Sequence, residues 1–339
     1  MIFCTLFNGR YLPQGLALYR SLETTAHGRF VLYALCMDEY SADALERLRL
    51  PAARIVRLAE FENDALRAAR SNRSFGEYCW TCTAPLMMRV QELAGADAVV
   101  AYVDADICFF SDPQKIFDEL GSKSIFVHEH DFAPAYRKFQ SQAGRFNVGV
   151  VAVRNNAEGR ECLERWHRQG LAECVMDVAN AKCGDQMYLD EWPQRYTGLV
   201  ISANPGIGRA PWNIEKHVLG RISDGVTADG VPIVFYHYHS LRVCRPRFGL
   251  RPILMAHAPY AFDRNIIRMI YDPYVGEMKR AIADVKAAGL PADAMLDDIG
   301  AIRFLANLAL RRLSVSFENS IPATAHFFAD PAARRPEGA

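Results

Sequence analysis

The sequence AYVDADICFF, residues 101–110, decides the fold class that we expect for this chain. This apolar run, rich in Val, Ile, Tyr and Phe, is typical of a buried strand, yet it contains Asp104 and Asp106. Carboxylates are costly to bury unless they meet a cation. Residues i and i+2 of an extended chain point to the same side, so both can converge on one metal ion. Hard cations such as Mg²⁺ or Mn²⁺ prefer oxygen ligands of this kind.

Strand-like and helix-like segments alternate before this run. The predicted strands are 2–7, 29–37, 54–58 and 99–103, and the predicted helices are 11–24, 42–48 and 82–94. Such alternation indicates an α/β architecture with a mostly parallel sheet flanked by helices. Ligands gather at the carboxyl ends of strands in open sheets of this type, and Asp104 and Asp106 lie where a strand is expected to end.

The composition is that of an ordinary globular protein of 339 residues, 50% hydrophobic and 23% charged. Lys plus Arg and Asp plus Glu number 39 each, so the charge balance does not indicate nucleic-acid binding. The N-terminus lacks the basic and apolar segments of a signal peptide. No charge-free run approaches the ~18 residues of a membrane span. We therefore expect a soluble cytoplasmic protein.

The nine cysteines are odd in number and irregularly spaced, which argues against a disulfide framework and fits a reducing compartment. Cys79 and Cys82 form a lone C-x-x-C motif without a thioredoxin-like context. A zinc site that adds Cys174 and Cys183 matches no zinc-binding spacing. We therefore expect buried free thiols.

The second half of the chain is more irregular and changes character near residue 245. We predict strands at 124–128, 148–153 and 231–238, a helix at 156–169, a loop at 203–213, and helices at 265–269, 274–288 and 296–313. The expected organisation is one main domain, residues 1–245, and a mainly helical C-terminal extension, residues 246–339, packed on it. A frayed tail is expected from about residue 330.

A second candidate for the site is FYHYH, residues 235–239, at the end of another apolar strand. His237 and His239 would share one face of that strand, so either can complete a site with the two aspartates. The alternative is a hydrogen-bonded core histidine.

Three further segments carry polar residues next to apolar ones. In CGDQ, residues 183–186, Asp185 is either a site residue or a helix cap. Asn147 stands beside Gly149, a glycine that permits close approach of a ligand or marks a bulge. Arg242 and Arg245 follow the histidines and either face a phosphate or are solvated surface charges.

Together these segments resemble the nucleotide-sugar glycosyltransferases of the GT-A fold, in particular glycosyltransferase family eight and related bacterial transferases. The matching residues are YVDAD (102–106), NVG (147–149), GDQ (184–186) and HYHS (237–240). They occur in the family's order and cover roughly residues 1–245. The resemblance implies a GT-A catalytic domain over that range.

The resemblance also implies a divalent cation, Mn²⁺ or Mg²⁺, that bridges the donor's diphosphate. Asp106 matches the direct metal ligand, and Asp104 matches a residue that touches both the metal and the ribose. His237 matches the family's metal-binding histidine, although Ser240 replaces the usual glycine, and His239 stays a rival.

For the donor, the resemblance implies that Asn147 lies near the sugar and that Asp185 and Gln186 lie near its reacting carbon. Leu6, Phe7 and Asn8, at the end of the first strand, match the family's base and ribose site. The family's usual lysine is missing at that offset, and Arg242 or Arg245 would substitute for it.

The implied activity is metal-dependent transfer of a hexose from a nucleotide sugar, UDP-sugars favoured, with retention. A saccharide or glycolipid acceptor in surface polysaccharide or lipopolysaccharide synthesis is expected. One alternative is a non-catalytic nucleotide- or sugar-binding protein on the same fold. A less favoured one is a phosphohydrolase of the haloacid-dehalogenase type, in which Cys108 stands where Thr or Val is usual. A membrane-surface helix within residues 302–313 is possible but not favoured.

Overall fold

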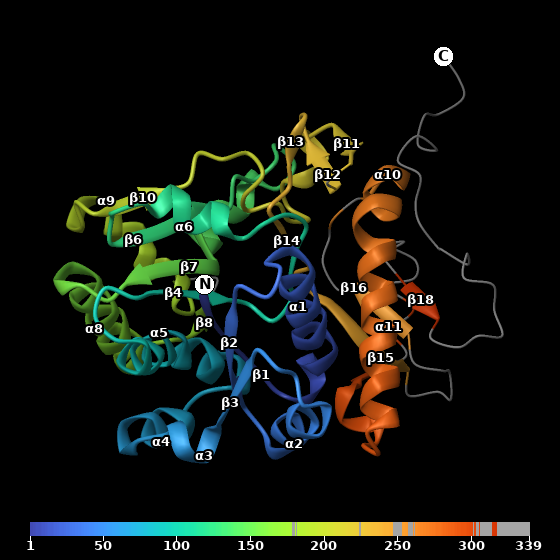
Figure 1. Ribbon diagram of the computed structural model, residues 1–339, viewed down its shortest axis with the longest axis horizontal. Coiled ribbons are helices and arrows are strands. Elements are labelled where there is room, and N and C mark those ends of the chain that lie inside the picture. The colour runs from blue at the N-terminus through green and yellow to red at the C-terminus, as the bar shows by residue number, and fades with distance from the viewer. Residues whose placement is uncertain are drawn as a thin grey trace.

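A seven-stranded sheet forms the centre of the molecule, and helices cover both of its faces (Figure 1). This computed structural model describes residues 1–177, 180, 182–223, 225–246, 253–256, 260, 262–300, 302, 305 and 314–316. The strand order is β10-β6-β7-β4-β1-β2-β3. The strands are β1 (Ile2–Phe7), β2 (Val31–Cys36), β3 (Ala53–Arg57), β4 (Val99–Val103), β6 (Ile125–Glu129), β7 (Phe146–Arg154) and β10 (Leu199–Ile201).

Strand β7 is the one strand of this sheet that runs antiparallel to its neighbours. It pairs antiparallel with β4 and with β6, whereas the remaining pairs are parallel. The expected α/β fold with a mostly parallel sheet is therefore confirmed. Strand β10 was not predicted from the sequence, because a strand of three residues gives no clear sequence pattern.

Side-chain alternation along the strands assigns a helical layer to each face of the sheet. Phe3 and Val103 pack with α1 (Leu12–Thr25) and α6 (Gln114–Leu120). Cys4 of the same β1 packs on the other face, against α5 (Phe75–Ala94) and α8 (Ala157–Ala172).

Helix α5 begins seven residues before the predicted start at residue 82. A capping box starts it, because the Ser74 side chain accepts from the backbone of Glu77 and the Glu77 side chain accepts from the backbone of Ser74. Pro85 lies inside the helix without ending it. The earlier start matters for the site, since the added first turns carry Phe75, Cys79 and Trp80 to the cavity described below.

The residues after 240 form a second, smaller sheet and a long helix. The sheet has the order β17-β15-β16-β18, with β15 (Leu241–Pro246), β16 (Ile253–Ala256), β17 (Asp297–Ile299) and β18 (Ser314–Ser316). The helices predicted at 265–269 and 274–288 correspond to α10 (Arg264–Ile266) with the π-helical η6 (Ile267–Tyr271), and to α11 (Asp272–Ala287). Helix α11 lies beside α1 and shares a core with it (Figure 1).

The helix predicted at 296–313 is wrong at its start. Residues 297–299 are strand β17, which pairs in parallel with β15 and so is held by a partner distant in the sequence. Most of the remainder of that range, and the expected tail from residue 330, lie outside the described residues. The domain division at residue 245 stays a prediction.

The other elements are short and connect these layers. They are η1 (Gly9–Tyr11), α2 (Glu39–Leu48), α3 (Leu58–Phe61), α4 (Asp64–Arg70), β5 (Ile107–Phe109), η2 (Arg137–Phe139), α7 (Gln140–Ala143), β8 (Met176–Asp177), β9 (Lys182–Cys183), η4 (Gln186–Glu191), α9 (Trp192–Arg195), η5 (Ile214–Lys216), β11 (Leu219–Ile222), β12 (Gly225–Ala228), β13 (Val231–Pro232), β14 (Phe235–His237) and η7 (Ala292–Met295).

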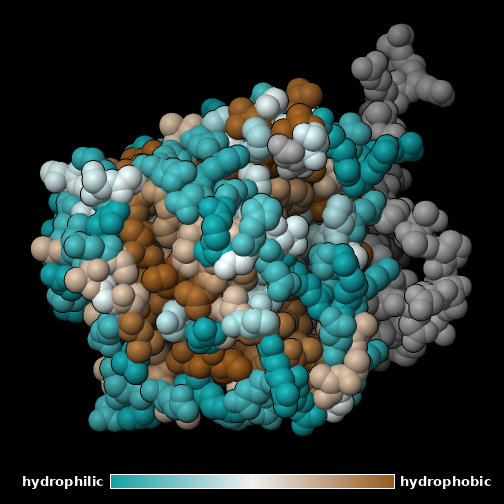
Figure 2. Space-filling model, viewed as in Figure 1, coloured by the Kyte–Doolittle hydropathy of each residue, from teal (hydrophilic) through white to brown (hydrophobic). Residues whose placement is uncertain are grey.

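The surface in Figure 2 shows hydrophobic residues gathered over the middle of one face, with hydrophilic residues around them. None of the described helices has both the length and the apolar character that a membrane crossing needs. The nine cysteines form no disulfide, and six of them are buried. The cytoplasmic location stays a prediction.

Candidate functional site

One cavity of about 570 Å³ lies at the carboxyl ends of β1 and β4, and the site residues predicted from the sequence, apart from Arg245, line it. They are Leu6, Phe7, Asn8, Asp104, Asp106, Asn147, Asp185, Gln186, His237, His239 and Arg242. Segments far apart in the sequence thus converge on the edge of the sheet where ligands of α/β proteins gather. The chemical role of each residue stays a prediction.

The acidic run consists of two strands joined by a turn. Strand β4 ends at Val103, the backbone N–H of Ile107 donates to the Asp104 carbonyl (3.1 Å), and β5 begins at Ile107. The single extended strand that we assumed for Asp104 and Asp106 is therefore wrong. Strand β5 pairs with β14 and places Ile107 opposite His237, so sheet pairing brings the histidine to the aspartates.

Asp104, Asp106 and His237 form what we call the Asp-Asp-His group. Their nearest ligand atoms all lie within 4.8 Å of one another. His237 Nε2 is 3.1 Å from Asp106 Oδ1 and 3.8 Å from Asp104 Oδ2. The Tyr102 hydroxyl donates to Asp104 Oδ1 (2.9 Å) and orients that carboxylate. Two carboxylates and one imidazole are a donor set that suits Mn²⁺ or Mg²⁺.

His239, the rival ligand, lies outside this group although it lines the same cavity. Strand β14 ends at His237, and the chain then turns, with Ser240 at a positive φ of 65°. The two histidines therefore do not share a strand face. The rings of His237 and His239 lie 5.9 Å apart between centroids, and both lie edge-on to Trp212, at 5.3 Å and 5.6 Å. The left-handed backbone at Ser240 suits the glycine that the family resemblance places at this position.

The side chain of Asn147 determines which nitrogen of His237 carries the proton. Asn147 Oδ1 accepts from the backbone N–H of Gly149 (2.9 Å), and this obligatory donor identifies the oxygen of the amide. The same oxygen lies 3.2 Å from His237 Nδ1, so Nδ1 carries a hydrogen. When the ring is neutral, Nε2 therefore presents its lone pair to the two aspartates, as a metal ligand must.

Gly149 is required by this arrangement. A Cβ atom at this position would lie 2.5 Å from Asn147 Oδ1 and 2.8 Å from His237 Nδ1, closer than side-chain contacts allow. The register between β6 and β7 also shifts in this region, between Phe126 and His128. Both interpretations of Gly149 therefore hold: the strand pairing is irregular near it, and other groups approach it closely. Those groups are the side chains of Asn147 and His237, not a ligand.

The charges of the Asp-Asp-His group are not balanced. Burial lowers the pKa of His237, but Asp106 and Asp104 outweigh burial and raise it. Burial raises the pKa of Asp106, yet His237 brings it below the ordinary value. For Asp104, burial and repulsion from Asp106 prevail over His237 and raise the pKa. Two carboxylates share one imidazole, and a divalent cation would supply the missing positive charge.

Asp185 presents an unpaired carboxyl oxygen in the cavity. The residue is 5% exposed, and its Oδ2 has no hydrogen-bond partner in the protein. It stands at the start of η4 without a side-chain capping bond, which removes the helix-cap alternative. Burial, with a smaller contribution from Asp104, raises the pKa of Asp185 to about 8. Trp166 Nε1 donates to its backbone carbonyl (2.9 Å) and fixes its position.

Both the oxygen and the nitrogen of the Gln186 side-chain amide are hydrogen-bonded within the protein. Its Oε1 accepts from Asn147 Nδ2 (3.0 Å) and from the backbone N–H of Val148 (3.2 Å), and its Nε2 donates to the Ala143 carbonyl (2.6 Å). Gln186 therefore positions Asn147 and the loop before β7.

Arg242 lines the cavity and also belongs to a set of ion pairs that we call the Arg-Asp cluster. It stacks over the Tyr11 ring, 5.1 Å from the centroid, and binds Asp297 (3.2 Å), which also binds Arg10 (3.3 Å). Arg245 is not among the lining residues. The cluster contains Arg10, Arg242, Arg245, Asp293, Asp297 and Asp298, in which Arg245 binds both Asp293 and Asp298.

Sequence reasoning missed an aromatic wall of the cavity, formed by His130, Phe132, Phe139, Trp212 and Tyr260. Its first two members follow β6 directly, in the segment HEHDF (128–132). Polar and aromatic residues at a strand end were the available signal, but no motif connects them to the acidic run.

One protein family and several individual proteins are similar to this chain. The family described as nucleotide-diphospho-sugar transferase matches residues 27–195. YfnD of Bacillus subtilis (strain 168) is 32% identical over 262 residues, which cover 76% of this chain and 83% of YfnD. YfnF of the same organism is 31% identical over 279 residues, 79% of this chain and 89% of YfnF.

Two solved structures are similar at lower identity. The galactosyltransferase LgtC, in complex with donor and acceptor sugar analogues, has a TM-score of 0.49 at 16% identity and covers 83% of this chain and 96% of its own. Mouse xyloside xylosyltransferase 1 has a TM-score of 0.42 at 14% identity, over 70% of this chain and 98% of its own.

Proposed function

Because the chain belongs to the nucleotide-diphospho-sugar transferase family, we propose that it moves a hexose from a nucleotide-diphosphate sugar, UDP-sugars favoured, to a saccharide or glycolipid acceptor. The reaction depends on Mn²⁺ or Mg²⁺ and retains the anomeric configuration. Its place is the synthesis of a surface polysaccharide or lipopolysaccharide. Family membership argues against the phosphohydrolase alternative.

The Asp-Asp-His group carries this proposal. Its two carboxylates and the lone pair of His237 Nε2 face one point on the cavity wall and leave negative charge uncompensated. Asp106 and His237 would hold the cation, and Asp104 would contact both the cation and the donor's ribose. A bound cation neutralises the charge that develops on the departing diphosphate.

The other lining residues have complementary tasks. Leu6 and Phe7 wall the end of β1, and Asn8 Oδ1, which has no partner in the protein, accepts from the base or ribose. Arg242 pairs with phosphate oxygens, for which a guanidinium fork is suited.

The sugar-binding part of the cavity is expected to be formed by Asn147 and Asp185. Asn147 lies between His237 and Gln186 and so connects the metal-binding side to the sugar side. In its ionised form, which a cation bound nearby would favour, Asp185 would stabilise the positive charge that builds on the anomeric carbon as the leaving group departs. Attack from the same face, with the leaving phosphate as base, accounts for retention.

The decisive experiment measures thermal unfolding and nucleotide release with UDP-, GDP- and CMP-sugars, each with and without Mn²⁺. We expect stabilisation and slow hydrolysis with UDP-sugars, and we expect both to require the metal. Binding without hydrolysis or transfer would favour the non-catalytic alternative. If no nucleotide sugar stabilises the protein, the proposed function is wrong.

A further inference from the structure

Two large apolar side chains on the wall of the cavity are exposed to solvent. Among the exposed large apolar residues of the described part of the chain, Phe75 (51%) and Met176 (46%) are those that line the cavity. Trp80, which is partly buried, also lines it. We call these three residues the apolar rim. Exposed apolar surface that is continuous with a binding cavity marks a place where the apolar part of a ligand binds.

Helix α5 and strand β8 together form the rim. Phe75 and Cys79, four residues apart, lie on one face of α5, and Trp80 lies beside them on the cavity side. The backbone N–H of Met176, in β8, donates to Glu77 Oε1 (2.9 Å). This bond fixes β8 against the first turn of α5, so the rim is built from two segments that the fold holds together.

The inner end of the rim lies beside the residues expected at the reacting carbon. Gly184, directly before Asp185, has a positive φ of 54°, and a Cβ atom there would lie 2.5 Å from the Trp80 ring. The ring therefore packs against the backbone next to Asp185. Five residues of helix separate Trp80 from Phe75, a rise of about 7.5 Å. The apolar surface thus extends from the neighbourhood of Asp185 to the exposed side chain of Phe75.

Four charged side chains around the rim have partners within the protein. The contacts are Arg73 with the Leu171 carbonyl, Glu77 with the N–H groups of Ser74 and Met176, Asp177 with Asn180, and Lys182 with Glu173. These contacts satisfy the nearby charges without a ligand. The rim therefore favours an uncharged apolar group over an anionic one.

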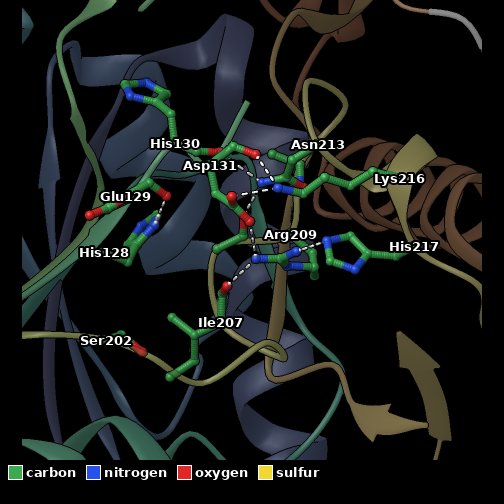
Figure 3. A network of polar contacts seen from close by, with 12 residues as sticks. His128, Glu129, His130, Asp131, Ser202, Ile207, Arg209, Asn213, Lys216 and His217 are labelled. Atoms are coloured by element: carbon green, nitrogen blue, oxygen red, sulfur yellow. Dashed lines mark hydrogen bonds and ion pairs between the residues drawn. The ribbon is translucent and has the colours of Figure 1, made fainter. Parts of the chain in front are cut away.

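The aromatic wall offers less surface to a second ligand. Its members Phe132 and Trp212 are only 9% and 3% exposed. A network of ion pairs holds the backbone directly before Phe132, because Arg209 donates to Asp131 Oδ2 (3.4 Å) and Lys216 donates to the Asp131 carbonyl (2.8 Å) (Figure 3). The protein itself thus covers these two rings, and the more exposed apolar side chains of the cavity are those of the rim.

We propose that the apolar rim binds the aglycone of the acceptor, so that the protein prefers a glycolipid with an alkyl chain to a free saccharide. This inference rests on the proposed function, in which the acceptor must bring a hydroxyl to the reacting carbon beside Asp185. An acceptor whose sugar lies there extends its aglycone past Trp80 toward Phe75 and Met176. Contact with the rim then removes apolar surface of the chain and of the protein from water.

The test compares the wild type with the double variant Phe75→Ser/Met176→Ser. Affinities for methyl and octyl β-glycosides of glucose and galactose, below the micelle concentration, are measured by calorimetry with UDP and Mn²⁺ present. We expect the wild type to bind the octyl glycosides at least about tenfold more tightly than the methyl glycosides, and the variant to lose most of this difference. Both replaced side chains are about half exposed, and the capping box of α5 is kept, so the variant should fold.

Val218→Ser/Ile222→Ser is the matched control. Both residues are exposed and apolar, at 76% and 47%, and neither lines the cavity. This control is expected to keep the wild-type preference for octyl glycosides. An equal loss in the control would mean that the alkyl chain associates with any exposed apolar surface, which would contradict the inference.

The inference is also overturned if the wild type binds octyl and methyl glycosides equally, or if the rim variant keeps the preference. Maltose that binds more tightly than octyl glucoside would assign the rim to a second sugar instead of a chain. Hydrolysis of UDP-sugars by the wild type is measured separately. If it occurs without a preference for octyl glycosides, the proposed function stands and only this inference fails. Failure of the wild type to bind any nucleotide sugar would instead reject the proposed function.

Discussion

Two groups of charged residues meet the same cavity and differ in how their charges are balanced. The Arg-Asp cluster contains three arginines and three aspartates, so its formal charges cancel. The Asp-Asp-His group has two carboxylates for one imidazole. The described ion pairs balance the charges of the first group, whereas the second leaves one carboxylate without a counter-charge, which the proposed cation would supply. Unbalanced buried charge therefore marks the functional site better than the number of charged residues does.

The largest effect is expected from Asp106→Asn, which keeps the shape of the side chain and removes its charge. Metal-dependent hydrolysis of the UDP-sugar should fall by at least about 100-fold, because the cation loses a direct ligand. Nucleotide release with titrated Mn²⁺ measures this. Asp118→Asn, an exposed aspartate on α6 outside the cavity, is the control. Unchanged activity and metal dependence in Asp106→Asn would exclude the residue as a ligand.

His237→Ala and His239→Ala should separate the two histidines. Loss of His237 removes the ring that lies 3.1 Å from Asp106, and Mn²⁺ affinity should weaken by on the order of 10- to 100-fold. Loss of His239 should change Mn²⁺ affinity by less than about threefold. Calorimetric titration of Mn²⁺ gives both values. Equal losses would place His239 in the site, and negligible losses from both would remove both histidines from it.

The pH dependence of unfolding tests the unbalanced charge at Asp185. Its folded-state pKa, about 8, lies above the ordinary value of 3.8, so the folded state binds this proton more tightly than the unfolded state. Its contribution to the free energy of unfolding of the metal-free protein should therefore decrease as pH rises from about 4 to 8. Asp185→Asn lacks this contribution, so its stability relative to the wild type should rise over that range, measured by denaturant unfolding. Parallel pH profiles for the two proteins would contradict the assignment.

The smallest effect is expected in the Arg-Asp cluster. Asp297→Asn releases Arg242 from a partly exposed pair, so stability should change by less than about 1 kcal/mol. UDP affinity should increase by about twofold, because the phosphate no longer competes with Asp297. Asp298→Asn, whose partner Arg245 does not line the cavity, is the control. Weaker UDP binding in Asp297→Asn would mean that the pair positions Arg242 for the donor.

Much of the fold was predictable because its information is local. Apolar runs marked most strands of the central sheet, and the acidic residues stood where β4 ends. Strand β17 was not predictable, because Asp297–Ile299 forms a strand only through pairing with β15, about fifty residues earlier. The start of α5 was predictable in principle, since Ser74 and Glu77 form a local capping box.

The sequence by itself determined the composition of the site: two aspartates after an apolar strand, two histidines after another, and an acidic residue beside Gln186. Only the tertiary structure separates the histidines, because the pairing of β14 with β5 brings His237 to 3.1 Å from Asp106 and leaves His239 outside the Asp-Asp-His group. It also placed Asn147 between His237 and Gln186 and His130 in the cavity wall. The physical reason is that hydrogen-bond geometry depends on distances between residues far apart in the chain, which no local pattern encodes.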